Sequence, residues 1–168
     1  MTKIAKSKKL LIVVGIISII FLILVVFILP TFSKSSVSIP EFPKGRLRIT
    51  QNEKILEIKI EVANTEELWE YGLMNRKSIP WKFGMLFVFN DYVDYGFWMK
   101  NTLVPLDIAF IDSEGKILNI QRMDPCEKEN CKIYKSPFPY MYALEAKAGF
   151  FKRFGFKEGA KIEFWMEK

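Results

Sequence analysis

The chain has 168 residues, with 25 Lys or Arg, 19 Asp or Glu and no His. The missing histidine excludes Ser-His and Cys-His catalytic dyads and every imidazole metal site. The formal net charge is +6, and four of the lysines lie in residues 1–9, which contain no acid. The rest of the chain therefore has 21 basic and 19 acidic residues, a net charge of only +2. This small excess is not the basic stripe of a nucleic-acid-binding protein, and we expect no nucleic-acid partner.

An uncharged apolar run of 20 residues, Leu10 to Leu29, follows the basic flank. As a helix it would span roughly 30 Å, the thickness of the hydrocarbon layer of a bilayer. A cleaved signal peptide has a shorter run and a small-residue cleavage site, and a core helix carries a polar face. We therefore predict a single transmembrane helix over residues 10–29 that anchors the protein in the cell membrane. The lysines of residues 1–9 predict a cytoplasmic N-terminus and a C-terminal domain outside.

Residues 30–45 contain four Ser and three Pro and predict a linker. Phe32 and Phe42, near this linker, are interpreted as aromatic side chains at the membrane surface. The extracytoplasmic domain is then residues 46–168. These roughly 120 residues are enough to bury one hydrophobic core without help from disulfides or metal ions.

Within the domain, hydrophobic residues mostly recur with the period of two that is typical of strands. Strands are expected over residues 55–62, 84–89, 95–99, 140–147 and 157–166, with a hairpin over 106–123 that turns at Gly115. A helix is expected to start at Asn64 as N-cap and to end at Gly72, and residues 149–156 predict a short helix or turn. The pattern predicts a mainly β (α+β) fold, with a compact, largely antiparallel sheet curled into a sandwich or barrel.

The most distinctive stretch is "FWMKNTLVPLDIAFID", Phe97 to Asp112. Lys100 and Asn101 offer an ammonium and an amide beside Trp98 and Met99, a combination that suits a sugar-like or anionic ligand. In the alternative interpretation Asn101 caps a turn and Lys100 extends to solvent. Met99 is also expected to fill the core rather than to bind metal.

Asp107 lies in an apolar strand, and a buried carboxylate needs a partner. We expect that partner to be Arg76 or Lys100, either in a structural ion pair or in a ligand site. The candidate ligand-binding residues are therefore Arg76, Trp98, Met99, Lys100, Asn101 and Asp107.

Cys126 and Cys131 are separated by four residues. A zinc site would need further thiolates or imidazoles, which the chain lacks, so no metal or other cofactor is expected. In an oxidising exterior the pair is expected to form a disulfide, and free thiols are the alternative.

The motifs "GLMNR", "GMLFVF", "FWMKNTLVPLDIAFID", a Cys pair, "ALEAKAGF" and "KEGAKIEF" occur in this order between residues 65 and 164. In this the chain resembles the "domain of unknown function 192" family, also called uncharacterised protein family 0127. The resemblance implies a compact, mostly β domain, commonly found behind a signal or anchor segment. It implies no activity, because none is established for the family as a whole.

Three functions fit these observations. The leading hypothesis is a non-enzymatic binding module for a small polar, carbohydrate-like or acidic ligand. One alternative is an enzyme of envelope glycan chemistry that uses Asp107 or Glu145 as acid or base; two carboxylates about 5–10 Å apart across a cleft would support it. The other alternative is a structural or interaction protein of the envelope, in which the central stretch only supports the fold.

The membrane anchor generates the first prediction. The protein should remain in the membrane pellet after alkaline extraction, because a long apolar helix is held by the bilayer and not by charge. Protease added outside intact spheroplasts should digest the domain. Release of a soluble form that begins near residue 31 would contradict the anchor.

Overall fold

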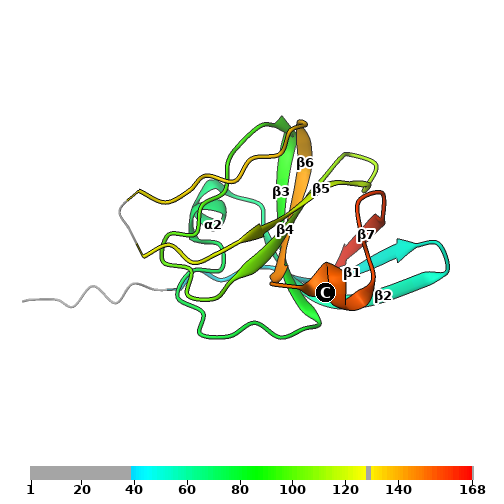
Figure 1. Cartoon of the computed structure of the whole chain (residues 1–168), viewed down its shortest axis with the longest axis horizontal. Helices are drawn as coiled ribbons and strands as arrows, with labels where there is room; N and C mark the ends of the chain where they lie inside the picture. The colour runs from blue at the N-terminus through cyan, green and yellow to red at the C-terminus, as the bar shows by residue number, and fades with distance from the viewer. Residues whose placement is uncertain (1–38, 128–129, 168) are drawn as a thin grey trace, which may run out of the picture. The chain divides into compact units, whose positions relative to one another are not determined.

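The computed structural model describes residues 39–127 and 130–167. Seven strands form one sheet in the order β5-β4-β6-β3-β2-β1-β7. The strands are β1 (Lys44–Gln51), β2 (Lys54–Ala63), β3 (Phe83–Val93), β4 (Leu106–Ile111), β5 (Ile117–Met123), β6 (Tyr140–Lys147) and β7 (Lys161–Met166), and the helices are α2 (Glu66–Tyr71) and α3 (Phe150–Phe154). The mainly β fold with two short helices is confirmed (Figure 1).

Five of the six strand pairs are antiparallel, and β2 and β3 are parallel. Parallel neighbours need a crossover connection, and here it contains α2. Thr65 caps this helix by accepting a hydrogen bond from the backbone of Leu68, so the expected start at Asn64 is wrong by one residue. Gly72 ends the helix, as expected.

The two edges of the sheet meet where β5 and β7 begin, which gives the sheet the shape of a half-barrel. The backbone N–H of Ile117 donates to the carbonyl of Ala160 at 2.8 Å, and that of Ile162 donates to Gly115 at 2.7 Å. Gly115 has a φ of 79°, and a Cβ added there would lie 2.3 Å from the carbonyl oxygen of Ile162. The expected turn at Gly115 is confirmed, and the closure requires glycine at this position.

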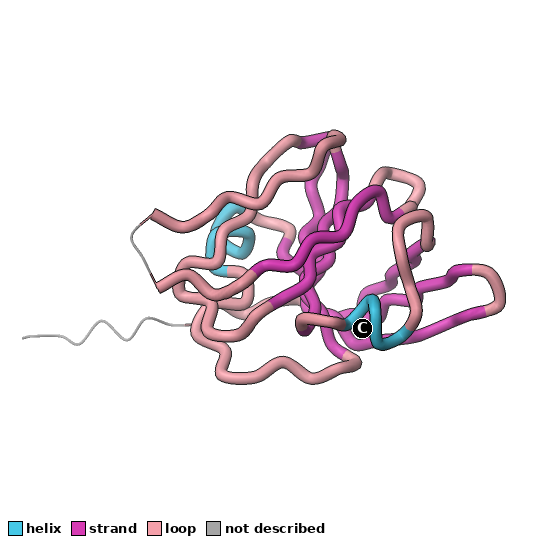
Figure 2. Tube along the Cα trace, viewed as in Figure 1, coloured by secondary structure: helices cyan, strands magenta, loops and turns pink. Residues whose placement is uncertain are grey.

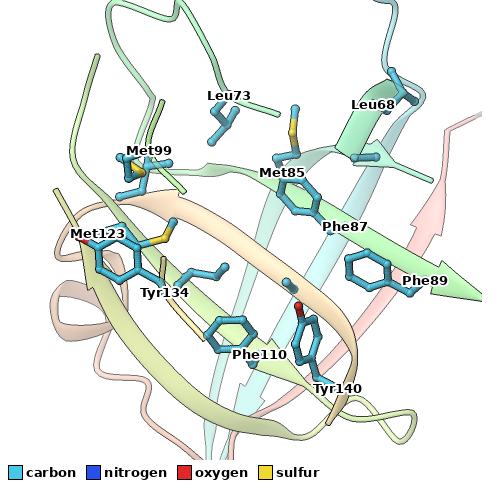
Figure 3. Close-up of a cluster of buried hydrophobic side chains, with 14 of the residues drawn as sticks. Leu68, Leu73, Met85, Phe87, Phe89, Met99, Phe110, Met123, Tyr134 and Tyr140 are labelled. Atoms are coloured by element: carbon cyan, nitrogen blue, oxygen red, sulfur yellow. The ribbon is translucent and has the colours of Figure 1, made fainter. Parts of the chain in front are cut away.

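Hydrophobic side chains are buried on both faces of the sheet. All six residues of β4 are buried, so alternate side chains enter two different cores. The inner core includes Ala109 and Ile111 and fills the half-barrel, whereas the outer core includes Ile108 and Phe110. Figure 3 shows part of the outer core, and Figure 2 shows that α2 and long loops lie on one side of the strands.

Two local expectations differ from the structure. β1 begins at Lys44, within the expected linker, and Phe42 is buried against Tyr71 with ring centroids 6.3 Å apart. Placing Phe42 at the membrane surface was therefore wrong. Residues 95–99 form no strand of the sheet, because only Phe97 pairs, in an isolated bridge with Tyr134.

Within the described residues, no helix is both long enough and apolar enough to cross a membrane. The predicted transmembrane helix over residues 10–29, the flank 1–9 and Phe32 all lie outside the described residues.

Asp107 joins β4 to the segment before α3. Its carboxylate accepts a hydrogen bond from the backbone N–H of Gly149 at 2.8 Å and lies 4.0 Å from Arg122, its cross-strand neighbour on β5. The expected pairing with Arg76 or Lys100 is wrong, because the register of the hairpin places Arg122 there instead. Arg122 is half exposed and also pairs with Asp124, so the removal of Asp107 leaves no buried cation.

We predict that Asp107→Ala lowers the free energy of unfolding by about 1–3 kcal/mol, because the Gly149 N–H loses its acceptor. Asp107→Asn keeps an acceptor oxygen and should cost less than about 1 kcal/mol. Asp124→Ala, which removes only the exposed partner of Arg122, is the control and should change stability by less than about 0.5 kcal/mol. Urea denaturation measures all three variants; equal losses for the Asn and Ala variants would instead assign the effect to the charge of Asp107.

Candidate functional site

The central stretch forms a tight turn from Met99 to Thr102. The N–H of Thr102 donates to the carbonyl of Met99 at 3.2 Å, and Asn101 has a φ of 56°. Asparagine tolerates this left-handed conformation better than most residues, which explains its presence at the third position of the turn. The carbonyl of Asn101 also accepts a hydrogen bond from the N–H of Asn75 at 2.8 Å. Asn101 therefore has a structural role in the backbone.

The other predicted site residues do not converge. Met99 is buried in the outer core, whereas Lys100 is exposed with its ammonium 5.2 Å from the ring centroid of Trp98. The Arg76 side chain pairs with Glu61 and lies over the rings of Phe42 and Phe83, with 5.9 and 5.5 Å from its Cζ to their centroids. Asp107 lies on the face of the sheet opposite to Ile108 and the outer core. Of the six residues, Trp98 lines the two adjoining hollows described next, and Met99 lines a separate hollow beside the disulfide.

A groove of about 260 Å³ lies between α2 and residues 95–98, on the outer-core side of the sheet. Most of its wall is aromatic, and its charged side chains are both carboxylates. The lining residues are Glu66, Trp69, Glu70, Phe87, Phe89, Tyr95, Gly96, Phe97 and Trp98. We call this hollow the aromatic groove.

A smaller cavity of about 30 Å³ adjoins the aromatic groove. The two hollows share five lining residues: Trp69, Glu70, Phe87, Phe97 and Trp98. The smaller one also reaches Thr102 and Glu145, which are 7% and 5% exposed. Its volume admits a group about the size of a water molecule but no ring. We call it the inner cavity.

Glu145 is the unusual residue of this site. Its neighbours across the sheet are Met85 on β3 and Ile108 on β4, both apolar. Among the described residues its carboxyl group has no hydrogen-bond or ion-pair partner, and burial raises its pKa to about 8. In the described part of the chain, every side-chain N or O atom that is fully enclosed has a hydrogen-bond partner. The Glu145 oxygens have no partner, so they are not fully enclosed, and the space that they face is the inner cavity.

The disulfide joins Cys126 to Cys131, with Cα atoms 5.6 Å apart. A hollow of about 350 Å³ lies beside it and is wider than the aromatic groove. The charged side chains that line it, Asp124, Glu127 and Lys132, are all exposed. It therefore lacks the buried carboxyl group that distinguishes the inner cavity. Across residues 39–127 and 130–167, no three His, Cys, Asp or Glu side chains gather where they could hold a metal ion.

These observations define a small, mainly β domain whose curled sheet carries a ligand-sized groove. The family model described as "DUF192: Uncharacterized ACR" matches residues 47–164, and the chain belongs to this family. The resemblance noted from the sequence motifs is thereby confirmed.

Two crystal structures resemble the domain. One, from Sinorhizobium meliloti 1021, is described as a candidate transcription regulator; it is 34% identical, the match covers 76% of this chain and 98% of that one, and the TM-score is 0.70. The other, from Novosphingobium aromaticivorans DSM 12444, is a protein of unknown function; it is 30% identical, with 71% and 84% of the two chains covered and a TM-score of 0.66. No curated protein matches the chain.

Sequence reasoning missed most of the aromatic groove. Trp69 and Glu70 were assigned only to a helix, and Glu145 was considered only as a catalytic acid or base. A signal for Glu145 exists, because it is the only acid in the otherwise apolar run "ALEA" of the strand expected over residues 140–147. The contact between α2 and residues 95–98, in contrast, has no local sequence signal.

The buried carboxyl predicts an unusual dependence of stability on pH. The pKa of Glu145 rises from an ordinary 4.5 to about 8 on folding, so the unfolded state releases this proton first as pH increases. Between pH 4.5 and pH 8, the contribution of Glu145 to the free energy of unfolding should fall by about 1.4 kcal/mol for each unit that the pH rises. Above pH 8 this contribution should level off.

Glu145→Gln mimics the protonated form and should remove this decline. The free energy of unfolding of Glu145→Gln minus that of the wild type should therefore increase from pH 5 to pH 8. Urea denaturation of both proteins at each pH measures this difference. Glu114→Gln, at an exposed turn position, is the control and should follow the wild type. A constant difference between wild type and Glu145→Gln across this range would show that Glu145 ionises normally.

Proposed function

We propose that the protein is a non-enzymatic binding module, held outside the cell membrane by residues 10–29, that takes a small carbohydrate-like ligand in the aromatic groove. The observation that carries this proposal is the Glu145 carboxyl, buried without a protein partner at the inner end of a groove. A domain gains nothing for its own stability by burying an unpaired carboxyl group. A ligand that supplies the missing hydrogen bonds accounts for it.

The walls of the groove suit a sugar ring. Trp69 and Trp98 provide broad aromatic faces; Trp98 is 45% exposed, and although Lys100 lies over its ring, a ligand can stack on the exposed part. Glu66 and Glu70 are exposed carboxylates that can accept hydrogen bonds from hydroxyl groups. The volume of about 260 Å³ suits one ring better than a chain.

An acidic ligand, which the sequence also suggested, is less well supported at this groove. Its lining contains carboxylates but no Lys or Arg, so a carboxylate or phosphate would be repelled. The same reasoning disfavours nucleic acid here, in keeping with the absence of a basic stripe in the sequence.

The enzymatic alternative used Asp107 or Glu145 as acid or base, and two carboxylates across a common cleft would have supported it. Ile108 lies opposite Glu145 in the register of β4 and β6, and Asp107 lies opposite Ala146. Adjacent residues of a strand point to opposite faces, so the two carboxyl groups do not flank a common cleft. This argues against a glycosidase-like pair formed by these two residues.

The proposal predicts saccharide binding that depends on Trp98. Monosaccharides and disaccharides screened against the full-length protein by saturation-transfer NMR should include binders. Trp98→Ala should weaken them about tenfold, the equivalent of about 1.4 kcal/mol for a lost stacking contact.

Trp165→Ala is the matched control, because Trp165 is 39% exposed but lies on β7, outside the aromatic groove. Neither substitution should change the unfolding midpoint appreciably, as both side chains are at the surface. The absence of any saccharide binder, or equal loss of binding in the two variants, would refute carbohydrate binding in the groove.

A further inference from the structure

We propose that the ligand carries a primary ammonium group, which enters the inner cavity and pairs with Glu145. This inference rests on the proposed function, because it names the chemistry of the ligand that the aromatic groove takes. An amino sugar with an exocyclic aminomethyl group has both parts.

The charges around the two hollows favour a cation. Three acids, Glu66, Glu70 and Glu145, line them, and no Lys or Arg does. The ammonium of Lys100 lies 5.2 Å from the Trp98 ring centroid, but Lys100 itself does not line either hollow. An incoming ammonium would thus meet carboxylates inside the hollows, and the Lys100 ammonium would stay at the rim, outside both of them.

The aromatic side chains of the wall also favour a cationic ligand. Indole and phenyl faces attract cations through the negative potential above the ring, with an energy that grows as water is excluded. Trp69, Phe87 and Phe97 line both hollows, so they would accompany a cation from the groove into the inner cavity. The position of Lys100 over Trp98 is an example of this contact at the rim of the same site.

The size of the inner cavity selects the type of cation. A volume of about 30 Å³ accommodates a primary ammonium but excludes a trimethylammonium group. A primary ammonium has three donors. The Glu145 carboxylate and the Thr102 hydroxyl, both of which line the cavity, can accept two of them.

Binding of a cation beside Glu145 is also coupled to the release of the proton that Glu145 carries. Burial keeps Glu145 protonated at neutral pH, with a pKa of about 8, and a neighbouring ammonium would favour the charged form. The other titratable groups that face the cavity are Glu70 and Tyr71, both from α2. The neighbours on β3 and β4 are Met85 and Ile108, which do not titrate. Binding should therefore release a proton from Glu145 and become tighter as the pH rises to about 8.

The test compares 6-amino-6-deoxyglucose with glucose on the full-length protein by isothermal titration calorimetry at pH 6, 7 and 8. The alkyl ammonium stays largely charged over this range, as that of lysine does. We expect the amino sugar to bind at least tenfold more tightly than glucose at pH 8, and its affinity to fall by up to tenfold per pH unit below that. In Glu145→Gln both the preference and the pH dependence should disappear, whereas Glu114→Gln should retain them.

A second pair of probes, propylamine and propanol, separates this inference from the proposed function. Equal binding of glucose and the amino sugar, or a preference that survives in Glu145→Gln, would overturn the ammonium site and leave carbohydrate binding intact. Glu145-dependent binding of propylamine over propanol, without binding of either sugar, would support the ammonium site and overturn the carbohydrate-like ligand. No binding of any of the four probes would overturn both.

Discussion

The central position of β6 is the constraint on which the rest of this structure depends. β6 pairs with β3 on one side and β4 on the other, and a hydrophobic core covers each face of the sheet. A polar side chain on such a strand cannot reach solvent by a change of rotamer. Glu145 is therefore held in an apolar setting, and burial alone accounts for its raised pKa. Its carboxyl group lines the inner cavity, and the proposed function is built on that position.

The groove in front of Glu145 is a consequence of topology. β2 and β3 are parallel neighbours, so the chain must cross over between them, and α2 lies in that crossover. The turn from Met99 to Thr102 and the bridge between Phe97 and Tyr134 hold residues 95–98 opposite α2. The aromatic walls thus come from two segments, α2 and residues 95–98, and each is held in place by a different part of the fold. Because backbone interactions hold each of these segments, we expect the wall to be preorganised for the proposed ligand.

The family and the similar crystal structures agree with the fold and leave the ligand open. The domain combines an unpaired carboxyl, an aromatic groove and exposed acids at its rim, and the proposed binding function rests on this combination. The residues of the distinctive central stretch divide between two roles. Asn101 and Met99 maintain the turn and the outer core, whereas Trp98 forms part of the groove wall.

The sequence by itself determined the elements whose signals are local. Period-two runs placed β6 and the hairpin of β4 and β5, Gly115 marked its turn, and the order of motifs identified the family. Only the tertiary structure decided the partners. Asp107 pairs with Arg122 through the register of the hairpin, Arg76 pairs with Glu61, and α2 packs near residues 95–98 to form the groove. These contacts depend on strand order and on the crossover, which join residues far apart in the chain, and a local pattern of hydrophobicity and turns carries no information about such pairings.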